Sequence, residues 1–542
     1  MSTAKSQNDD NSNSFDVVIV GAGFSGVYQL YRLRDEGFNV HLIEAGGGLG
    51  GIWHWNCYPG ARVDTHCQIY QFSRPDLWKE WNWSERFPGW EEMRKYFDYV
   101  DQKLDLSKDV SLNTRVSGAE FNQANGEWVI NTDSKGEYRA KFIVLCTGFA
   151  SKPYQPTIPG VEDFLGDANH TALWPQQGID FTDKKVGVIG TGASGIQVAQ
   201  EAFKVASHVT VFQRTPNMYL PMGQEVYSET DNVAMKEELP ARFKRRAETF
   251  GGFDMDLIPT SGLDVSEKER EATFERLWAA GGFSFWLGNF YDIFSDEKVN
   301  RAAYDFWLKK TRARIKDPVL AEKLAPLEPP HPYGVKRPSL EQWYFDIFNH
   351  KNATLVSLME EPISKITATG IETEKNSYDF DVIAFATGFD AVTGGLTSID
   401  IVGTNGITLK DKWSQGVRSH MGLATANFPN MLVSYGPQAP TGFCNGPSSA
   451  EYQGECVIET LLFMRDNEYS QFDVTSEAEE YWRSHVLELA DATLFPKADS
   501  WYMGANIPGK PKEMLMYPGG LPSYLEAFRN CVNEGYQGFS FS

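Results

Sequence analysis

The chain has few cysteines and no motif that pairs them closely. Its 542 residues include six cysteines, and none of these form a Cys-x-x-Cys motif. A redox-active dithiol and a zinc ribbon both depend on that spacing, so the sequence disfavours both. The nine histidines show no metal-ligand cluster either. We therefore expect no bound metal, and the scattered cysteines favour a reducing, cytoplasmic setting.

Basic residues and long apolar runs are also scarce. The chain has 50 Lys and Arg against 72 Asp and Glu, a net charge of −22, which argues against nucleic acid and anionic membranes as partners. No apolar run approaches the roughly 20 residues that span a bilayer. Residues 1–14 are polar and lack the apolar centre of a signal peptide, so we expect a disordered tail there.

Two glycine-rich turns are present, Gly21–Gly26 and Gly190–Gly195, each of the form Gly-x-Gly-x-x-Gly. Each follows an apolar strand and precedes a helical pattern, as a dinucleotide-binding βαβ unit requires. Glycine lets backbone approach a pyrophosphate, and the helix N-terminus offers it free N–H groups. The expected cofactor contacts are Gly21, Gly23 and Gly26 in the first turn and Gly190, Thr191, Gly192, Ser194 and Gly195 in the second.

The residue that ends the second strand differs between the two units. Glu44 lies 18 positions after Gly26, and Arg214 lies 19 positions after Gly195. A carboxylate accepts hydrogen bonds from ribose hydroxyls and repels a 2′-phosphate, which suits FAD or NAD. A guanidinium fits a 2′-phosphate, so we expect NADPH in the second unit, although a surface salt bridge is the alternative for Arg214.

Two further strands end in Thr-Gly, at Thr147-Gly148 and Thr387-Gly388, and they flank the second βαβ unit. We therefore predict an α/β fold with two Rossmann-like dinucleotide-binding domains, the second inserted into the first. Residues 228–323 lose the β pattern, and Ser266–Glu269 has the form of a capping box, which predicts a helical insertion. The predicted boundaries are 15–150 and 385–542 for the FAD domain, 151–222 and 330–384 for the NADP domain, and 223–329 for the insertion.

The linker between the turns carries a longer motif. Phe164–Pro175 has the form Phe-x-Gly-x-x-x-His-x-x-x-Trp-Pro, and Gly50–Asp64 has the form Gly-Gly-x-Trp-x-x-x-x-Tyr-Pro-Gly-x-x-x-Asp. In both segments the chain resembles the type I Baeyer–Villiger monooxygenases of the cycloalkanone and phenylacetone group. The resemblance extends from Val17 to about Gly538. One departure is Cys57, where related members often carry arginine.

The resemblance implies roles for particular residues. Arg337, in Lys336-Arg337-Pro338, would be the catalytic arginine and Asp64 its orienting partner, and Lys336 would lie near the NADP 2′-phosphate. A salt bridge between domains is the alternative for the Arg337–Asp64 pair. Further implied contacts are Gly51, Trp53, Asp64 and Trp501 for the cofactors, Phe164, Gly166, His170, Trp174 and Pro175 for the hinge, and Phe443 and Cys444 for the substrate pocket.

The implied reaction inserts one oxygen atom of O₂ beside a ketone carbonyl, with NADPH as reductant and a C4a-peroxyflavin as the oxygenating species. The substrates would be cyclic, aryl or linear ketones, and the protein a monomer or weak homo-oligomer. Two alternatives stay open. One is a flavin monooxygenase that oxidises nitrogen or sulfur, and the other is a non-enzymatic flavoprotein that senses NADPH. A disulfide oxidoreductase is disfavoured because the chain lacks Cys-x-x-Cys.

Overall fold

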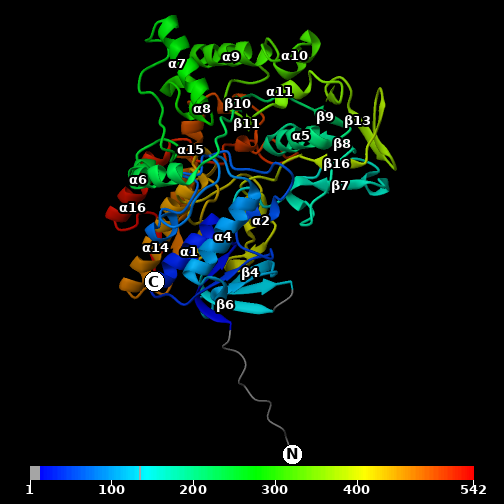
Figure 1. Cartoon of the computed structure of the whole chain (residues 1–542). Helices are drawn as coiled ribbons and strands as arrows, with labels where there is room; N and C mark the ends of the chain where they lie inside the picture. Colours follow the sequence, from blue (N-terminus) through cyan, green and yellow to red (C-terminus); the bar gives the residue numbers. More distant parts are fainter. Residues whose placement is uncertain (1–12, 134–135) are drawn as a thin grey trace, which may run out of the picture.

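The computed structural model describes residues 13–133 and 136–542. Two sheets dominate it, and each belongs to one βαβ unit (Figure 1). The first has the strand order β17-β4-β5-β6-β1-β2-β3, with β18 also paired to β6. Its strands are β1 (Ser14–Val20), β2 (Val40–Ile43), β3 (Val110–Ser111), β4 (Val116–Asn122), β5 (Glu127–Thr132), β6 (Glu137–Leu145), β17 (Asp400–Val402) and β18 (Met431–Val433).

The second sheet is parallel throughout, with the order β12-β9-β8-β16-β7. Its central strands are largely apolar and, apart from the first residues of β8 and β9, buried, as expected for a parallel sheet covered on both faces. Its strands are β7 (Asp167–His170), β8 (Lys185–Ile189), β9 (His208–Gln213), β12 (Ala353–Ser357) and β16 (Val382–Phe385). The expected fold class, α/β with two Rossmann-like units, is confirmed.

The two glycine turns each lead from a central strand into a helix. The helices are α1 (Phe24–Asp35) after the first turn and α5 (Ala193–Val205) after the second. Helix α14 (Gly446–Asp466) packs against α1 and covers the first unit. The strand before each turn and the helix after it, which the sequence pattern predicts, are both present.

Helices replace strands between residues 229 and 324, as the fading β pattern indicates. These are α6 (Glu229–Arg246), α7 (Glu267–Ala280), α8 (Ser284–Leu287), α9 (Glu297–Arg312) and α10 (Pro318–Leu324), which form the green region of Figure 1. The Ser266 hydroxyl accepts a hydrogen bond from the backbone N–H of Glu269, and the Glu269 carboxylate accepts one from the backbone N–H of Ser266. The predicted capping box is therefore confirmed.

The other elements are short or lie near the C-terminus. The helices are α2 (Ile52–Trp55), α3 (Pro75–Trp78), α4 (Trp90–Leu104), α11 (Tyr344–Ile347), α12 (Gly394–Thr397), α13 (Leu409–Lys412), α15 (Ser476–Asp491) and α16 (Leu521–Asn533). The strands are β10 (Tyr219–Pro221), β11 (Ser339–Glu341), β13 (Ile363–Thr367), β14 (Gly370–Thr373), β15 (Ser377–Asp379), β19 (Phe472–Val474) and β20 (Phe539–Phe541).

The predicted tail, residues 1–14, lies outside the described residues as far as residue 12, and Ser14 already belongs to β1. The domain boundaries stay predictions. Among the residues that the structure describes, none of the helices combines the length and apolar character that a bilayer crossing requires.

The two segments that connect the units lie side by side. Tyr154 donates a backbone hydrogen bond to Gly388 (2.9 Å), and the Thr387 hydroxyl donates to the carbonyl of Tyr154 (2.5 Å). The segment that follows Thr147-Gly148 is therefore hydrogen-bonded to Thr387-Gly388, and we call this place the junction between the two units.

Candidate active site

The two glycine turns have the same backbone geometry. Gly21 and Gly190 have φ of +103° and +108°, in the region that favours glycine. A Cβ on Gly26 would lie 1.8 Å from the carbonyl oxygen of Gly21, and one on Gly195 would lie 2.1 Å from that of Gly190. The first and third glycines of each turn are therefore required by the turn's own packing.

The middle glycines face open space instead. A Cβ on Gly192 would meet no atom within 4 Å, and one on Gly23 would meet only the Cα of Gly51 at 3.7 Å. Each turn thus presents bare backbone at the N-terminus of a helix, which is the surface a pyrophosphate requires. The residues fit a dinucleotide at both turns, and Gly51 borders the first.

Glu44 and Arg214 lie in contrasting surroundings. Glu44 is buried, and its two carboxylate oxygens accept hydrogen bonds from the backbone of Ala22 (2.7 Å) and Gly46 (2.6 Å). Glu44 therefore lies directly against the first turn. Arg214 is exposed, and its side chain makes no hydrogen bond or ion pair within residues 13–133 and 136–542. An unpaired guanidinium beside the second turn leaves its donors available to an anion.

Lys336 lies close to Arg214 and, like it, has no hydrogen-bonded partner among the described residues. Burial, with the charge of Arg214, lowers the pKa of Lys336. The nearest carboxylate is Asp499, which forms an ion pair with Lys512 (2.7 Å). Three cations and one carboxylate thus gather beside the second turn. This surplus of positive charge fits the 2′-phosphate of NADP.

Arg337 lies between the two units and is held by two hydrogen bonds. Its Nε donates to Asp64 Oδ2 (3.0 Å), and its Nη1 donates to the carbonyl of Gly442 (2.9 Å). Burial lowers the pKa of Arg337, but the charge and hydrogen bond of Asp64 together with the nearby Tyr502 and Tyr435 outweigh this, so the pKa is raised overall. The guanidinium therefore stays positively charged at any pH at which the protein is folded.

Two aromatic rings lie against the same guanidinium. The Cζ atom of Arg337 lies 4.8 Å from the ring centroid of Phe283 and 5.6 Å from that of Trp286. Both rings come from the helical insertion, in and just before α8. The catalytic candidate is thus enclosed by three separate parts of the chain.

The segment that carries Asp64 also joins the two units. Tyr58 donates a hydrogen bond from its hydroxyl to Gln197 on α5 (2.7 Å). A Cβ on Gly60, where φ is +83°, would lie 2.8 Å from the carbonyl oxygen of Gln197. The glycine of the Tyr-Pro-Gly motif therefore allows this segment to approach the second βαβ helix.

Trp53 and Cys57 belong to the same segment. The indole N–H of Trp53 donates to the Tyr70 hydroxyl (3.2 Å), and the ring is buried. Cys57 contacts the carbonyl of Trp174 (3.5 Å). Arg94, from α4, donates to the carbonyl of Trp53 (3.1 Å) and to Gln176 (2.6 Å). An arginine from α4 therefore lies beside the segment that carries Cys57.

His170 lies in the linker. Its Nε2 lies 3.1 Å from the carbonyl of Gly388, and its Nδ1 accepts a hydrogen bond from the backbone of Ala172 (3.1 Å). Burial lowers its pKa, so the ring is neutral near pH 7 and Nε2 is the donor. His170 therefore connects the linker to the junction between units and lies away from Arg337.

The remaining linker residues pack against one another. A Cβ on Gly166 would lie 2.8 Å from the Phe164 ring and 2.4 Å from the carbonyl oxygen of Asp381, so glycine is required there. Trp174 is buried and packs edge-on against Phe181 at 6.1 Å. Pro175 follows, half-buried. The fingerprint residues thus stiffen the connection at which the two units meet.

The segment 499–513, named here the Trp501 loop, lies over the junction. Trp501 stacks on Phe149 (5.3 Å, 15°), and a Cβ on Gly442 would lie 2.7 Å from the indole ring. Because Gly442 also accepts a hydrogen bond from Arg337, the loop and the arginine meet at one glycine. Lys510 pairs with Asp390 (2.9 Å), which fastens the loop to the junction.

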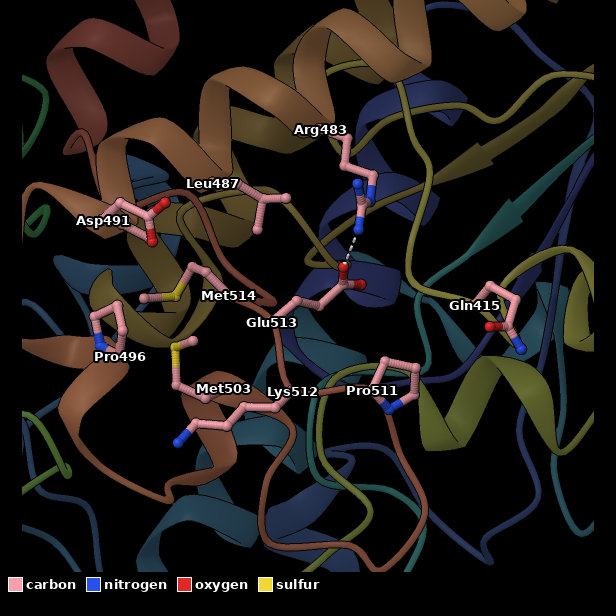
Figure 2. A pocket seen from close by; sticks show the side chains of 11 residues that line it. Gln415, Arg483, Leu487, Asp491, Pro496, Met503, Pro511, Lys512, Glu513 and Met514 are labelled. Atoms are coloured by element: carbon pink, nitrogen blue, oxygen red, sulfur yellow. Dashed lines mark hydrogen bonds and ion pairs between the residues drawn. The ribbon is translucent and has the colours of Figure 1, made fainter.

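The base of the Trp501 loop is fixed by Glu513, which pairs with Arg483 of α15 (2.6 Å). Figure 2 shows Glu513 pointing toward Arg483, whereas the adjacent Lys512 points away. This side of the loop borders a cavity of about 370 Å³ whose lining includes Met503. Lys512, half exposed, borders this cavity and pairs with Asp499.

Phe443 and Cys444 are buried by protein. The Phe443 ring stacks on Tyr502 (4.8 Å, 28°) and packs edge-on against Phe495 (4.9 Å). Burial raises the pKa of the Cys444 thiol to about 12, so it is not a thiolate at neutral pH. Their assignment to a substrate pocket stays a prediction. The surroundings of Phe443 are aromatic.

Sequence reasoning missed four residues that the structure places here: Arg94, Phe283, Trp286 and Asp499. Phe283 and Trp286 lie in an aromatic stretch of the insertion that reads like an ordinary helical core. No local pattern distinguishes an aromatic ring that faces a guanidinium from one that fills a core. Asp499 could have been noticed, because it is the first residue of the Trp501 loop.

Comparison with known proteins agrees with this arrangement. Residues 15–281, which include both turns, match the family described as pyridine nucleotide-disulphide oxidoreductase. The disulfide chemistry in that description has no counterpart here, because all six cysteines are free and buried and none forms a Cys-x-x-Cys motif. The match therefore reflects the nucleotide-binding framework.

Two relatives and one solved structure are similar over almost the whole chain. A cyclopentanone 1,2-monooxygenase from a Comamonas species is 54% identical, over 99% of this chain and 97% of its own length. A phenazine N-monooxygenase from Lysobacter antibioticus is 37% identical, over 98% of each chain. A crystal structure of OTEMO in complex with FAD and NADP has a TM-score of 0.94 and 36% identity, covering 98% of this chain and 100% of that one.

The linker fingerprint, the paired turns and a relative similar over nearly its full length lead to one conclusion. The chain belongs to the Baeyer–Villiger monooxygenases, an oxidoreductase family that uses FAD and NADPH.

Proposed function

We propose that this chain converts cyclic ketones into lactones, and aryl or linear ketones into esters. The balance is ketone, O₂, NADPH and one proton giving ester, NADP⁺ and water. One oxygen atom enters between the carbonyl carbon and a neighbouring carbon, and the other leaves as water. The observation that carries the proposal is Arg337, charged and enclosed by Asp64, Gly442 and the aromatic rings of the helical insertion.

FAD, when bound and reduced by NADPH, supplies the oxygen-activating chemistry. The first turn and Glu44 would hold it, because Gly23 leaves bare backbone for a pyrophosphate. Arg214 and Lys336 would hold the NADPH 2′-phosphate, because neither has a carboxylate partner of its own. The chain's own residues then orient the reactants and govern charge and water at the site.

Arg337 would stabilise negative charge that develops on oxygen during transfer to the ketone. A fixed cation in a water-poor site needs no reorganisation as charge develops, which makes it more effective than a mobile one. Asp64 fixes the Nε edge, and Gly442 fixes one terminal nitrogen. These two hydrogen bonds hold the cation in a single orientation. Arg337 stays protonated and acts through its charge.

The Trp501 loop would exclude water from this centre. Its indole covers Gly442, and its base and tip are fastened by Glu513 and Lys510. His170, neutral and bonded to Gly388, would keep the two units at a constant spacing. Reduced water access protects a reactive oxygenating species from breakdown.

The substrate should be apolar. Around Arg337 lie the rings of Phe283, Trp286 and Tyr502, and the only carboxylate it contacts is Asp64 among the described residues. Burying a substrate carboxylate without its own cation is costly, because Arg337 is already paired. An apolar site discriminates between two substrates that differ by one methylene by only about 1–3 kcal/mol, so several ketones should be accepted.

The second candidate is oxidation of a ring nitrogen, which is favoured by the similarity to a phenazine N-monooxygenase. Family membership therefore does not by itself decide between carbon–carbon insertion and N-oxidation. The two differ in what Arg337 must do. Insertion beside a carbonyl requires an anionic oxygen nucleophile that a cation can stabilise, whereas in N-oxidation the nitrogen lone pair attacks an electrophilic oxygen. The compartment and oligomeric state stay predictions.

Product analysis tests the proposal. FAD-loaded protein is incubated with NADPH, O₂ and cyclopentanone, cyclohexanone, phenylacetone, a keto acid of similar size or a phenazine. We expect esters from the three neutral ketones, and Arg337→Ala to lower ester formation by about 100-fold to 1,000-fold. N-oxide without any ester would refute ketone insertion, and a preference for the keto acid would refute the apolar pocket.

A further inference from the structure

Two residues of the helical insertion contact Arg337, although no sequence motif indicates this. Phe283 and Trp286, called here the aromatic pair, lie 51 or more positions before Arg337 in the chain. Their rings face its guanidinium at 4.8 and 5.6 Å. The two rings also pack edge-on against each other at 5.1 Å. The insertion therefore forms one side of the arginine's binding place.

Trp286 also contacts the backbone that leads to Arg337. Its indole N–H donates to the carbonyl of Gly334 (3.0 Å). At Gly334 φ is +75°, and a Cβ there would lie 2.8 Å from the indole ring. The side chain of Trp286 is fully buried, so its position is determined by packing. Trp286 thus fixes both the loop three residues before Arg337 and the face of the guanidinium itself.

Aromatic faces suit this task for a physical reason. A second carboxylate would hold the arginine but would cancel its remaining charge. A ring attracts the cation through its quadrupole, takes no N–H donor from it in a conventional hydrogen bond, and leaves the charge in place. The rings also exclude water, which strengthens the field of the cation at short range. The pair can therefore orient Arg337 while leaving it effective toward an oxygen anion.

We propose that Phe283 and Trp286 are positioning residues for Arg337, with Trp286 the more important. This inference rests on the proposed role of Arg337. It makes the helical insertion part of the active site, because the insertion supplies the wall against which the cation is held. Asp64 fixes one edge of the guanidinium, and the aromatic pair fixes its plane.

Two substitutions at Trp286 separate the ring from its hydrogen bond. Trp286→Phe removes the indole N–H and keeps an aromatic face, whereas Trp286→Leu removes both. We expect Trp286→Leu to lower ester formation by about 10-fold to 30-fold and to divert NADPH consumption to hydrogen peroxide. Trp286→Phe should stay within about 3-fold of the parent. Flavin reduction by NADPH should change less than about 2-fold in both, because that step precedes the role of the cation.

Trp307 provides a matched control. It is a buried tryptophan of α9 in the same insertion, and its indole N–H also donates to a backbone carbonyl, that of Tyr219 (2.8 Å). In the structure it does not stack on Arg337. Trp307→Leu therefore creates comparable core damage without touching the cation. We expect it to lower the melting temperature as Trp286→Leu does, but to leave the ratio of ester to peroxide unchanged.

Crystal structures of the FAD-loaded variants provide a readout that does not depend on turnover. We expect the Arg337–Asp64 contact to persist in Trp286→Phe and the guanidinium to leave its plane in Trp286→Leu. If Trp286→Leu fails to fold, Phe283→Leu tests the same wall and should raise peroxide release in the same direction. Both readouts depend on the wall and not on overall stability.

Three results would overturn the inference. One is equal diversion to peroxide in Trp286→Leu and Trp307→Leu. Another is a loss in Trp286→Phe as large as in Trp286→Leu, which would assign the effect to the Gly334 hydrogen bond. The third is an unmoved arginine in the variant structures. If the parent protein itself makes no ester, the proposed function fails instead, and the two failures are thereby distinguished.

Discussion

The two nucleotide-binding units share a backbone but differ in their side chains. In both turns the first glycine has a φ above +100°. A Cβ added to the third glycine would lie less than 2.2 Å from the carbonyl oxygen of the first. Glu44 in the first unit is buried and bonded to two backbone N–H groups. Arg214 in the second is exposed and unpaired within the described residues. The charged side chain of the first unit is thus already hydrogen-bonded within the protein, whereas the guanidinium of the second is available to an anion.

This difference corresponds to how each cofactor is used. A prosthetic group that stays through many cycles is served by a preformed, buried site. A reductant that must enter and leave is served by exposed cations and by an exposed ion pair beside them, which contributes little and exchanges readily. The Lys512–Asp499 pair is of this kind, with side chains 47% and 74% exposed.

The largest expected effect comes from adding one methyl group to the third glycine of each turn. Gly26→Ala places a Cβ against the Gly21 carbonyl, and Gly195→Ala does the same at Gly190. Overpacking of this kind costs about 3 kcal/mol or more. We expect Gly26→Ala to yield protein without FAD, and Gly195→Ala to keep FAD but lose NADP⁺ binding.

Flavin absorbance and NADP⁺ titration measure these two outcomes. Gly192→Ala is the matched control, because its Cβ would meet no protein atom within 4 Å. It should leave the melting temperature unchanged and weaken NADP⁺ only. Loss of FAD in Gly195→Ala would contradict the independence of the two units.

The next effect concerns Glu44. Glu44→Ala leaves the backbone N–H groups of Ala22 and Gly46 buried without an acceptor, at a cost of about 1–3 kcal/mol each. We expect weakened FAD retention and a lower melting temperature, whereas Glu44→Gln, which keeps one oxygen, should lose less. Unchanged FAD affinity in Glu44→Ala would show that the carboxylate does not organise the first turn.

Arg214 should matter for one coenzyme only. Arg214→Ala removes charge-assisted hydrogen bonds worth about 1.5–3 kcal/mol, so NADPH affinity should fall by about 10-fold to 100-fold. NADH, which lacks the phosphate, should bind within about 2-fold of the parent. Equal losses for both coenzymes, measured by anaerobic titration, would remove the contrast with Glu44.

The framework of both units could be predicted from sequence because its signals are local. Strand, glycine turn and helix follow one another within about 25 residues, and the charge at the end of the second strand is a single position. The linker could be found through a motif of fixed spacing. His170 and Gly166 then have visible reasons, one a bond to Gly388 and the other the space that Phe164 requires.

What could not be predicted depends on contacts between distant segments. The aromatic pair reaches Arg337 from the insertion, and Arg94 reaches Gln176 and the Trp53 carbonyl from α4. No pattern within a helix states which of its rings will face a cation elsewhere. The surroundings of Phe443 were equally hidden, because Phe495 and Tyr502 approach it from beyond α15.

The smallest effect sharpens the comparison in the opposite direction, through a gain in affinity. Among the described residues, Asp499 is the carboxylate whose charge acts on Lys336 beside Arg214, and it would repel a 2′-phosphate bound there. Asp499→Asn removes that charge while keeping an oxygen that can accept from Lys512. We expect NADP⁺ and 2′,5′-ADP to bind about 2-fold to 5-fold more tightly, and NAD⁺ to be unaffected. Because the side chains of Asp499 and Lys512 are exposed, the gain in affinity should shrink as the salt concentration is raised.

Calorimetric titration of FAD-loaded protein at low and high salt measures this gain. Glu297→Gln is the matched control, because Glu297 forms an exposed ion pair with Lys497, two residues before Asp499, and is not among the charges that act on Lys336. It should leave the affinity for NADP⁺ unchanged. Weaker binding of 2′,5′-ADP to Asp499→Asn would mean that Asp499 assists the phosphate by holding Lys512 in place. The second unit would then be as preorganised as the first, and the contrast between a completed site and a waiting one would fail at this position.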